Sequence, residues 1–519
     1  MHFRKLIASV MLCVMMLTIF SGCGGNSNGL KQAVTEPGEN GKITKEPLEL
    51  KMHMMITTDA YDYDKVKMFG KAFEKTNIKV VGSGLGTGND VNSAFNIMMV
   101  SNPLPDIIHG TKSNLMKYAT EGAFVDLDPY INAYAPNIKK FFEENEWARK
   151  GSLAADGKLY YIPHIRYGTP MKGFYIRTDW LEKLGLDVPK TTEEFYNVLK
   201  AFRERDPNGN GIKDEVPYFY RDKGVDDLLQ LFGVKYSWYI TGDGKCEYGK
   251  VQPEMKTAAT ELARWYKEGL IDQEIYTRGS SAREQLLGGN VGGATHDWFT
   301  TTASFNDKYT DSINGFAFEA IAPPADINGK VKEDYARKLL SGNGWAISKD
   351  NRYIVETIKF FDFWYSEEGI RLFNYGVEGV DYNMVDGKPV YTDTVLKAEG
   401  GAPDYLRKIG KNELGSMSLI ESEVQTMNAQ ARKGFSLYAD NNYCSEQFPD
   451  LTFTTEEQRI IKEKETAINT YVSEKMQAWI MGNESPEENF DEYIATVKSM
   501  GYDELRTAYQ NAYDRYMKQ

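Results

Sequence analysis

The stretch LELKMHMM, residues 48–55, alternates apolar and polar side chains, as a β-strand with one buried face does. Residues 64–75 carry apolar side chains at helical spacing, and residues 78–81 form a short apolar run typical of a second strand. A further helix over 91–100 and a third strand over 105–108 continue the pattern. This alternation predicts a mostly parallel sheet with helices on both faces, in which ligands bind beyond the carboxyl ends of the strands.

The first 22 residues have the composition of a bacterial export signal, with a basic start and an apolar run that ends before Cys23. That run is shorter than the about 20 apolar residues needed to cross a membrane. Small residues before a cysteine predict a lipoprotein cleavage site, with lipid on Cys23, although Phe20 replaces the usual leucine. A plain secretory peptide is the alternative. Residues 23–46 are rich in Gly, Asn, Ser and charge, which predicts a flexible tether to the outer face of the cell membrane.

The remaining chain is long and acidic. Its roughly 480 residues should divide into at least two cores. The formal net charge of −13 argues against a nucleic-acid partner. Only Cys246 and Cys444 remain after the signal and lipid cysteines, which is too few for a disulfide framework and leaves open whether the two pair.

The common motifs of hydrolases and nucleotide-dependent enzymes are missing from the sequence. It has no H-E-x-x-H, no G-x-S-x-G and no G-x-x-x-x-G-K-[ST], and only five histidines. The Gly-rich stretch 82–88 lacks the third glycine of a dinucleotide fingerprint, because Asn89 stands there. Asp126 and Asp128 could serve a glycan-processing enzyme, but acidic pairs are common on an acidic surface. We therefore expect a protein that is not an enzyme.

Residues 206–215, DPNGNGIKDE, follow the first half of an EF-hand loop. Oxygen-bearing side chains stand at loop positions one, three and five, and a glycine supplies the turn at position six. Pro217 occupies position twelve in place of the usual glutamate, and Glu215 at position ten could supply the missing carboxylate. We predict a structural calcium ion here. The alternative is a polar Asn-Gly turn that caps the preceding helix.

Four segments together resemble one family. They are YIRTDWLEKLGL at 175–186, GKLYYIP at 157–163, GNGWAI at 342–347 and YGVEGVDY at 375–382. Taken together, in the order in which they occur along the chain, these segments resemble family 1 extracellular solute-binding proteins, and the chain is most similar to the lipoprotein branch that includes alginate-binding proteins.

The resemblance implies an α/β fold of the type II periplasmic-binding-protein kind, with two lobes, hinge crossovers and a helical C-terminal tail. It places residues 47–163 and 317–380 in one lobe, and residues 164–316 and 381–519 in the other. It implies a carbohydrate-like ligand held between the lobes and delivered to the permease of an ABC importer, and we expect a monomer. It also implies these calcium ligands: Asp206, Asn208, Asn210, Ile212, Asp214 and Glu215.

A sugar-binding cleft needs flat aromatic side chains for the apolar faces of the sugar rings and polar side chains for their edges. Residues near the expected crossovers are the candidates: Tyr161, His164, Arg166, Tyr167, Asp297, Trp298, Trp345 and Tyr382. Core packing is the alternative for each aromatic side chain. An acidic or sulfated sugar is favoured if Arg166 has no carboxylate partner. The sequence leaves open whether the ligand is a sugar, a peptide or another solute. A surface sensor that takes no part in transport is an alternative function.

Overall fold

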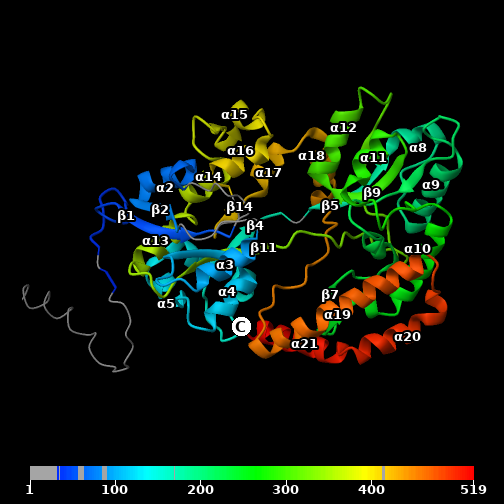
Figure 1. The fold of residues 1–519 in the computed structure, drawn as a ribbon. Helices are drawn as coiled ribbons and strands as arrows, with labels where there is room; N and C mark the ends of the chain where they lie inside the picture. The colour runs from blue at the N-terminus through cyan, green and yellow to red at the C-terminus, as the bar shows by residue number, and fades with distance from the viewer. Residues whose placement is uncertain (1–31, 34, 56–62, 84–89, 169, 412–414) are drawn as a thin grey trace, which may run out of the picture.

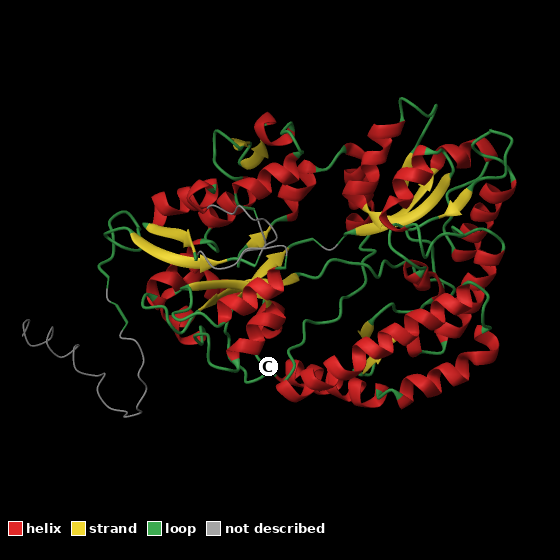
Figure 2. Ribbon diagram, viewed as in Figure 1, coloured by secondary structure: helices red, strands yellow, loops and turns green. Residues whose placement is uncertain are grey.

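The computed structural model describes residues 32–33, 35–55, 63–83, 90–168, 170–411 and 415–519. These residues form two lobes that lie side by side and are joined by thin connecting segments (Figure 1). Each lobe has its own sheet with helices around it (Figure 2). The two-lobed α/β fold predicted from the sequence is therefore confirmed.

The first lobe contains a six-stranded sheet in the order β14-β4-β11-β3-β1-β2. The strand and helix order predicted for residues 48–111 is present, because β1 pairs in parallel with both β2 and β3. In contrast, β11 runs antiparallel to both of its neighbours, β3 and β4. The strands are β1 (Leu48–His53), β2 (Ile78–Gly82), β3 (Ile107–Thr111), β4 (Ile162–Arg166), β11 (Leu340–Ile347) and β14 (Met417–Ser418).

The second lobe contains a four-stranded sheet in the order β10-β5-β9-β6. Only β6 and β9 pair in parallel, whereas β5 is antiparallel to both β9 and β10. The sheets are thus mixed, where the sequence predicted mostly parallel pairing. Strands that enter a lobe directly from a connection, such as β5 and β11, run against their neighbours. The strands are β5 (Lys172–Arg177), β6 (Val216–Tyr218), β9 (Gly292–Trp298) and β10 (Phe318–Ile321).

Helices cover both sheets (Figure 2). In the first lobe they are α2 (Lys67–Thr76), α3 (Val91–Met99), α4 (Lys112–Ala119), α5 (Asp128–Tyr134), α6 (Pro136–Glu144), α7 (Glu146–Ser152), α13 (Ile354–Phe363), α14 (Glu367–Tyr375), α15 (Asp393–Leu396) and α16 (Ala402–Ile409), with the 3-10 turn η1 (Tyr63–Lys65) and the hairpin β12 (Tyr382–Val385) and β13 (Lys388–Tyr391).

In the second lobe they are α8 (Thr178–Leu184), α9 (Thr192–Glu204), α10 (Glu254–Lys267), α11 (Ala282–Gly288), α12 (Phe299–Tyr309), α18 (Ala429–Asp440), α19 (Thr455–Ile480), α20 (Pro486–Ser499) and α21 (Tyr502–Lys518), with the 3-10 turns η2 (Asp226–Phe232), η3 (Gly249–Val251) and η4 (Gly279–Ser281) and the hairpin β7 (Trp238–Ile240) and β8 (Cys246–Tyr248). Helix α17 (Ile420–Thr426) lies at the junction of the lobes (Figure 1).

The boundaries between the lobes differ from those expected. Strand β10, expected in the first lobe with residues 317–380, pairs with β5 in the second. Residues 382–417, expected in the second lobe, contribute Tyr382, Tyr391 and Met417 to the core of the first. The reason is that local patterns identify a strand or helix but do not specify which sheet it joins.

The C-terminal helices α19, α20 and α21 pack on the second lobe, as the predicted helical tail required. Thr454 and Glu457 form a capping box at the start of α19. Farther along, the Trp479 and Tyr493 rings meet edge to face with centroids 5.0 Å apart. These helices therefore share a core with α10 and do not form a separate domain.

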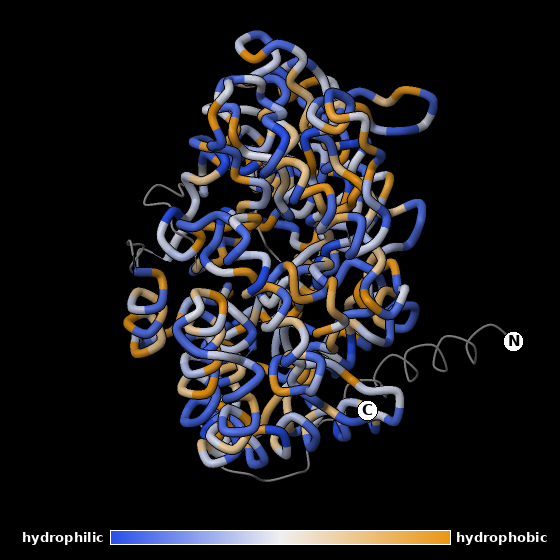
Figure 3. Tube along the Cα trace, turned by 90° about the vertical axis from the view of Figure 1, so that its right-hand side faces the viewer, coloured by the Kyte–Doolittle hydropathy of each residue, from blue (hydrophilic) through white to orange (hydrophobic). Residues whose placement is uncertain are grey.

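The second half of the expected tether packs against the first lobe. The Ala33 amide donates to the Arg352 carbonyl at 2.8 Å, and the Ile43 amide donates to the Thr76 carbonyl at 3.0 Å. Thr44 is buried. Any free tether is thus shorter than residues 23–46, while Cys23 and the signal lie outside the described residues. Apolar segments of the described chain are short and interrupted by polar ones (Figure 3), and none of its helices is long and apolar enough to span a membrane.

Candidate functional site

Three segments cross between the lobes, and we call them the three crossings: described residues 167–168 with 170–171, residues 322–339 and residues 419–428 (Figure 1). Main-chain hydrogen bonds hold their first-lobe ends together. The Arg166 amide donates to the Leu339 carbonyl at 2.8 Å, and the Tyr167 amide donates to the Ser418 carbonyl at 3.0 Å. The junction of the lobes is therefore a compact hinge, and side chains at the strand ends beside it are the ones that can face a ligand.

Trp298 is the predicted residue best placed to contact a ligand from the second lobe. It ends β9, and 37% of its side chain is exposed. On one side, the Lys172 ammonium lies 5.7 Å from the Trp298 ring centroid. The same ammonium donates to the Tyr220 hydroxyl at 3.2 Å and lies 5.1 Å from the Tyr335 ring. A buried cation thus holds three aromatic rings around it, with Trp298 facing outward.

Asp297 is wholly buried behind Trp298. Its Oδ1 accepts the Trp298 amide at 2.7 Å, and the guanidinium groups of Arg221 and Arg283 lie 3.4 and 3.3 Å from its carboxylate oxygens. Burial raises the pKa of Asp297, while the charges of Arg283, Arg221 and Lys172 oppose the rise. Asp297 is therefore placed to fix the main chain at Trp298.

Polar side chains of the first lobe stand where parallel strands end, and the sequence analysis missed them. Asn92 lies in the first turn of α3, after β2, and Asn114 lies in the first turn of α4, after β3. The Asn114 amide donates to Asn92 Oδ1 at 3.3 Å, and the Tyr118 hydroxyl donates to Asn96 Oδ1 at 3.0 Å. The rule that ligands bind beyond carboxyl ends could have identified these residues.

Lys172 and Tyr220 were also missed, and their sequence signal is weak. Lys172 starts β5 directly after a crossing, and Tyr220 follows the end of β6. Their meeting with Trp298 depends on the pairing of β5 and β6 with β9. The sequence pattern does not specify that pairing.

The residues before the first crossing behave differently from one another. His164 is buried and its Nε2 lies 3.1 Å from the Ser418 hydroxyl, which makes it a hydrogen-bonded interior residue. Arg166 is partly exposed, and burial and the charge of Arg337 lower its pKa, while Glu423 opposes this. Arg337 in turn binds the Glu423 carboxylate at 2.8 Å. Two guanidinium groups thus lie near one carboxylate at the hinge.

Tyr167, also predicted to meet the ligand, is partly buried in the first crossing, and burial raises its pKa. Its backbone pairs with β14 at the hinge. Tyr167 therefore lies at the first-lobe end of the hinge, whereas Trp298 lies on the second lobe.

Three other predicted ligand residues lie in interior positions. Trp345 has no exposed surface and packs on Phe361, with ring centroids 4.9 Å apart. Tyr161 is equally buried, and Tyr382 belongs to the core of the first lobe. These three rings therefore pack in the core, which was the alternative to ligand binding, and they do not lie with Trp298.

The predicted calcium loop lies between α9 and β6 and is wound around Asp206. The two Asp206 carboxylate oxygens accept the main-chain amides of Gly209, Asn210 and Gly211 at 2.9 to 3.1 Å. Gly209 and Gly211 adopt positive φ values of 75° and 77°, which favour glycine. The side-chain amides of Asn208 and Asn210 both reach the Asp214 carboxylate at 3.0 Å. Hydrogen bonds among these side chains and with the main chain thus hold the oxygen-bearing residues of the loop close together.

Glu215 supplies the strongest sign of a cation. Only 2% of it is exposed, and neither carboxylate oxygen has a hydrogen-bond partner. Burial raises the pKa of Glu215, the negative charges of Asp214 and Asp206 add to the rise, and the nearby main-chain amides of Glu215 and Asn208 oppose it. The described residues contain no grouping of three or more His, Cys, Asp or Glu side chains suited to a metal. A site that also uses Asn side chains and the Ile212 carbonyl is of a different type, and its oxygen donors fit calcium.

Cys246 and Cys444 do not form a disulfide with each other. Cys246 is buried, and burial raises the pKa of its thiol to about 12. It is thus a packing residue of the second lobe.

Comparison with known proteins shows the family to which the chain belongs. Residues 59–370 match the family model described as bacterial extracellular solute-binding protein. This match covers more than half of the sequence.

Two relatives and one solved structure show how far the similarity extends. The chain is 25% identical to the fructooligosaccharide ABC transporter substrate-binding protein FusA of Streptococcus pneumoniae serotype 4, over 99% of both chains. It is 26% identical to lipoprotein LipO of Bacillus subtilis, over 84% of this chain and 86% of LipO. The crystal structure of alginate-binding protein AlgQ2 without calcium ion is 36% identical, covers 92% of this chain and all of AlgQ2, and has a TM-score of 0.75.

Proposed function

The chain belongs to the bacterial extracellular solute-binding proteins, and from this premise we propose that it captures an oligosaccharide between its lobes and delivers it to the permease of an ABC importer. Its relatives are named as binding proteins for fructooligosaccharide and alginate. The observation that carries the proposal is the exposed Trp298 ring beside the hinge, held from behind by Lys172 and Asp297.

In this proposal each lobe supplies part of the contact. Trp298 stacks on the apolar face of a sugar ring, and the Tyr220 side of the cluster offers polar groups to its edge. Asn92 and Asn114, at the strand ends of the first lobe, offer amide groups that can bind hydroxyl groups. Because the two sets lie on different lobes, the closed arrangement makes more contacts with one ligand than the open one, and ligand binding favours closure.

We also propose that the loop of residues 206–215 holds calcium. Side chains of Asp206, Asn208, Asn210, Asp214 and Glu215, with the Ile212 carbonyl, would hold it. A bound dication would compensate the buried Glu215 carboxylate and clamp the connection between α9 and β6. Its role is to stabilise the second lobe, because a single loop without a partner loop has no means of opening a groove.

The predicted anchor at Cys23 belongs to the same proposal. The relative LipO is named as a lipoprotein. Lipid on Cys23 would hold the protein at the outer face of the cell membrane, next to its permease. Mass spectrometry of the membrane-extracted protein should find an acylated N-terminal cysteine after cleavage, and an unmodified mature chain would contradict the anchor.

The binding proposal is tested by calorimetric titration of the mature protein with panels of neutral oligosaccharides, uronate oligosaccharides and peptides. We expect an oligosaccharide to bind, and Trp298→Ala to weaken that binding at least tenfold. Tyr134→Ala removes an exposed ring in α5, on the first lobe, and is the matched control. Binding that survives Trp298→Ala would refute the site, and cleavage of the bound sugar would favour the enzyme alternative.

A further inference from the structure

A short connection on the second lobe reaches back to the first. Residues Pro449, Asp450, Leu451 and Thr452 precede α19, and we call them the strap. Phe453, which follows the strap, packs edge to face on Tyr509 of α21, with ring centroids 5.1 Å apart. The Arg515 guanidinium of α21 donates to the Thr452 carbonyl at 2.9 Å. The strap is therefore fixed to the C-terminal helices of the second lobe.

The first lobe holds the strap through one lysine. Lys112 starts α4, directly after β3, and its ammonium donates to the carbonyls of Gly151, Asp450 and Leu451 at 2.7, 3.0 and 3.1 Å. An ammonium has three N–H groups, so this set of acceptors uses all of them. Two of the acceptors belong to the strap and one to the end of α7, which makes Lys112 a connector between the lobes.

Packing around the ammonium is tight. A Cβ at Gly151 would lie 2.4 Å from Leu340 Cδ1, so a larger residue would have to displace the Leu340 side chain, and it would lie 3.5 Å from Asp450 Cβ, an ordinary contact distance. The Lys338 ammonium, on the second crossing, lies 3.4 Å from Asp450 Oδ1. The strap thus meets the first lobe next to the hinge, as a fourth connection that is not covalent.

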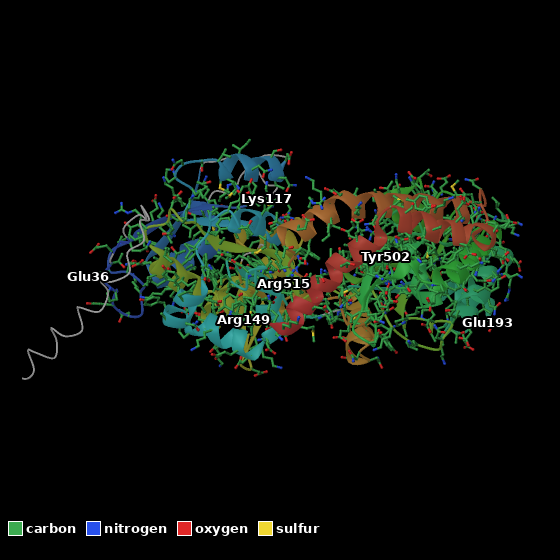
Figure 4. All side chains as sticks on the ribbon, turned by 90° about the horizontal axis from the view of Figure 1, so that it is seen from below. Glu36, Lys117, Arg149, Glu193, Tyr502 and Arg515 are labelled. Atoms are coloured by element: carbon green, nitrogen blue, oxygen red, sulfur yellow. The ribbon has the colours of Figure 1, made fainter. Side chains whose placement is uncertain are left out.

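The C-terminal helix approaches the first lobe at the same place. Seen from below, α21 runs from Tyr502 toward Arg515, at its end on the side of the first lobe (Figure 4). A groove here is lined by Asp156 and Gly157 on the first lobe and by Asp514 and Lys518 on α21. Around Lys112 the two lobes therefore contact each other through side chains and main chain, whereas the three crossings join them as covalent chain segments.

We propose that Lys112 holds the strap as a latch between the lobes and thereby controls how freely they move about the hinge. This inference deepens the proposed function and rests on it, because lobe movement matters only for a protein that closes on a ligand. Opening or closing about the crossings changes the separation of Lys112 and the strap. Releasing the latch should therefore broaden the range of lobe arrangements before any ligand binds.

The test is made on the ligand-free mature chain, with Lys112→Met, which keeps the length of the side chain and removes the ammonium. Hydrogen exchange read by mass spectrometry should show the strap amides exchanging at least tenfold faster, with β9 unchanged. Small-angle scattering should show a larger radius of gyration. Lys117→Met, which removes an exposed ammonium in the last turn of the same helix and contacts Tyr118, is the matched control and should change neither readout.

Lys112→Gln, which shortens the side chain and leaves two N–H donors in place of three, gives a second test if Lys112→Met does not fold. Strap exchange and scattering identical to the unaltered protein in either folded variant would overturn the proposal. Failure to bind any sugar would count against the proposed function instead, because neither readout uses a ligand.

Discussion

Replacing Glu215 with Gln should have opposite effects with and without calcium. Without the ion, the buried carboxylate has no hydrogen-bond partner and lies near the charges of Asp206 and Asp214. Glutamine removes that charge and keeps the shape. With the ion, the carboxylate is a ligand, and glutamine is a poorer one. Calcium should therefore stabilise the unaltered protein and have much less effect on Glu215→Gln.

The size of the effect follows from mass action. Calcium at 100 times its dissociation constant stabilises the folded state by about 2.7 kcal/mol. The second lobe has roughly 260 residues and an unfolding entropy of about 0.55 kcal/mol per kelvin, so its midpoint should rise by about 5 °C. Glutamine removes only the buried charge beside Asp206 and Asp214, so calcium-free Glu215→Gln should melt above the calcium-free unaltered protein.

Differential scanning calorimetry with calcium or with a chelator measures both effects on both proteins. Glu204→Gln, which changes a carboxylate at the end of α9 outside the loop, is the control and should respond to calcium as the unaltered protein does. Equal midpoints of the unaltered protein with calcium and with chelator would refute the metal site. A full calcium response in Glu215→Gln would refute the role assigned to that carboxylate.

Other predictions concern the two lobes and pH. Trp345→Ala should cost about 3–5 kcal/mol of unfolding free energy, because a fully buried ring leaves a cavity, and chemical denaturation will measure it; a loss below 1 kcal/mol would contradict the burial. Burial lowers the pKa of Lys112 from 10.5 to about 8; the charge of Asp450 opposes this lowering and the charge of Lys338 adds to it. The folded chain therefore binds fewer protons than the unfolded chain between these pH values, and stability rises with pH there by at most about 1.4 kcal/mol per pH unit. Lys112→Met should lose this rise in denaturation curves from pH 8 to 10, and an identical slope in both proteins would exclude it. The raised pKa of Glu215 changes stability in the opposite direction. Without calcium, stability should fall as pH increases from 4.5 through the folded pKa, and Glu215→Gln should remove that fall.

The sequence by itself determined the local elements and the loop. Alternation at residues 48–55 and helical spacing after it predicted the order of β1, α2 and β2, because side-chain periodicity reports which face of an element is buried. The spacing of Asp206, Asn208 and Asn210 predicted a wound loop, because its turns depend on neighbouring residues. The family was recognisable from four short segments in order.

Only the tertiary structure decided which residues form the candidate site. Trp298 and Trp345 look equivalent in sequence, yet Trp298 ends a strand beside the hinge and Trp345 lies inside a core. Lys172 meets Trp298 because β5 pairs with β9, and Lys112 meets the strap across the lobes. Strand pairing and burial depend on contacts between residues far apart in the chain, and a pattern of neighbouring side chains carries no information about which distant partner packs against it.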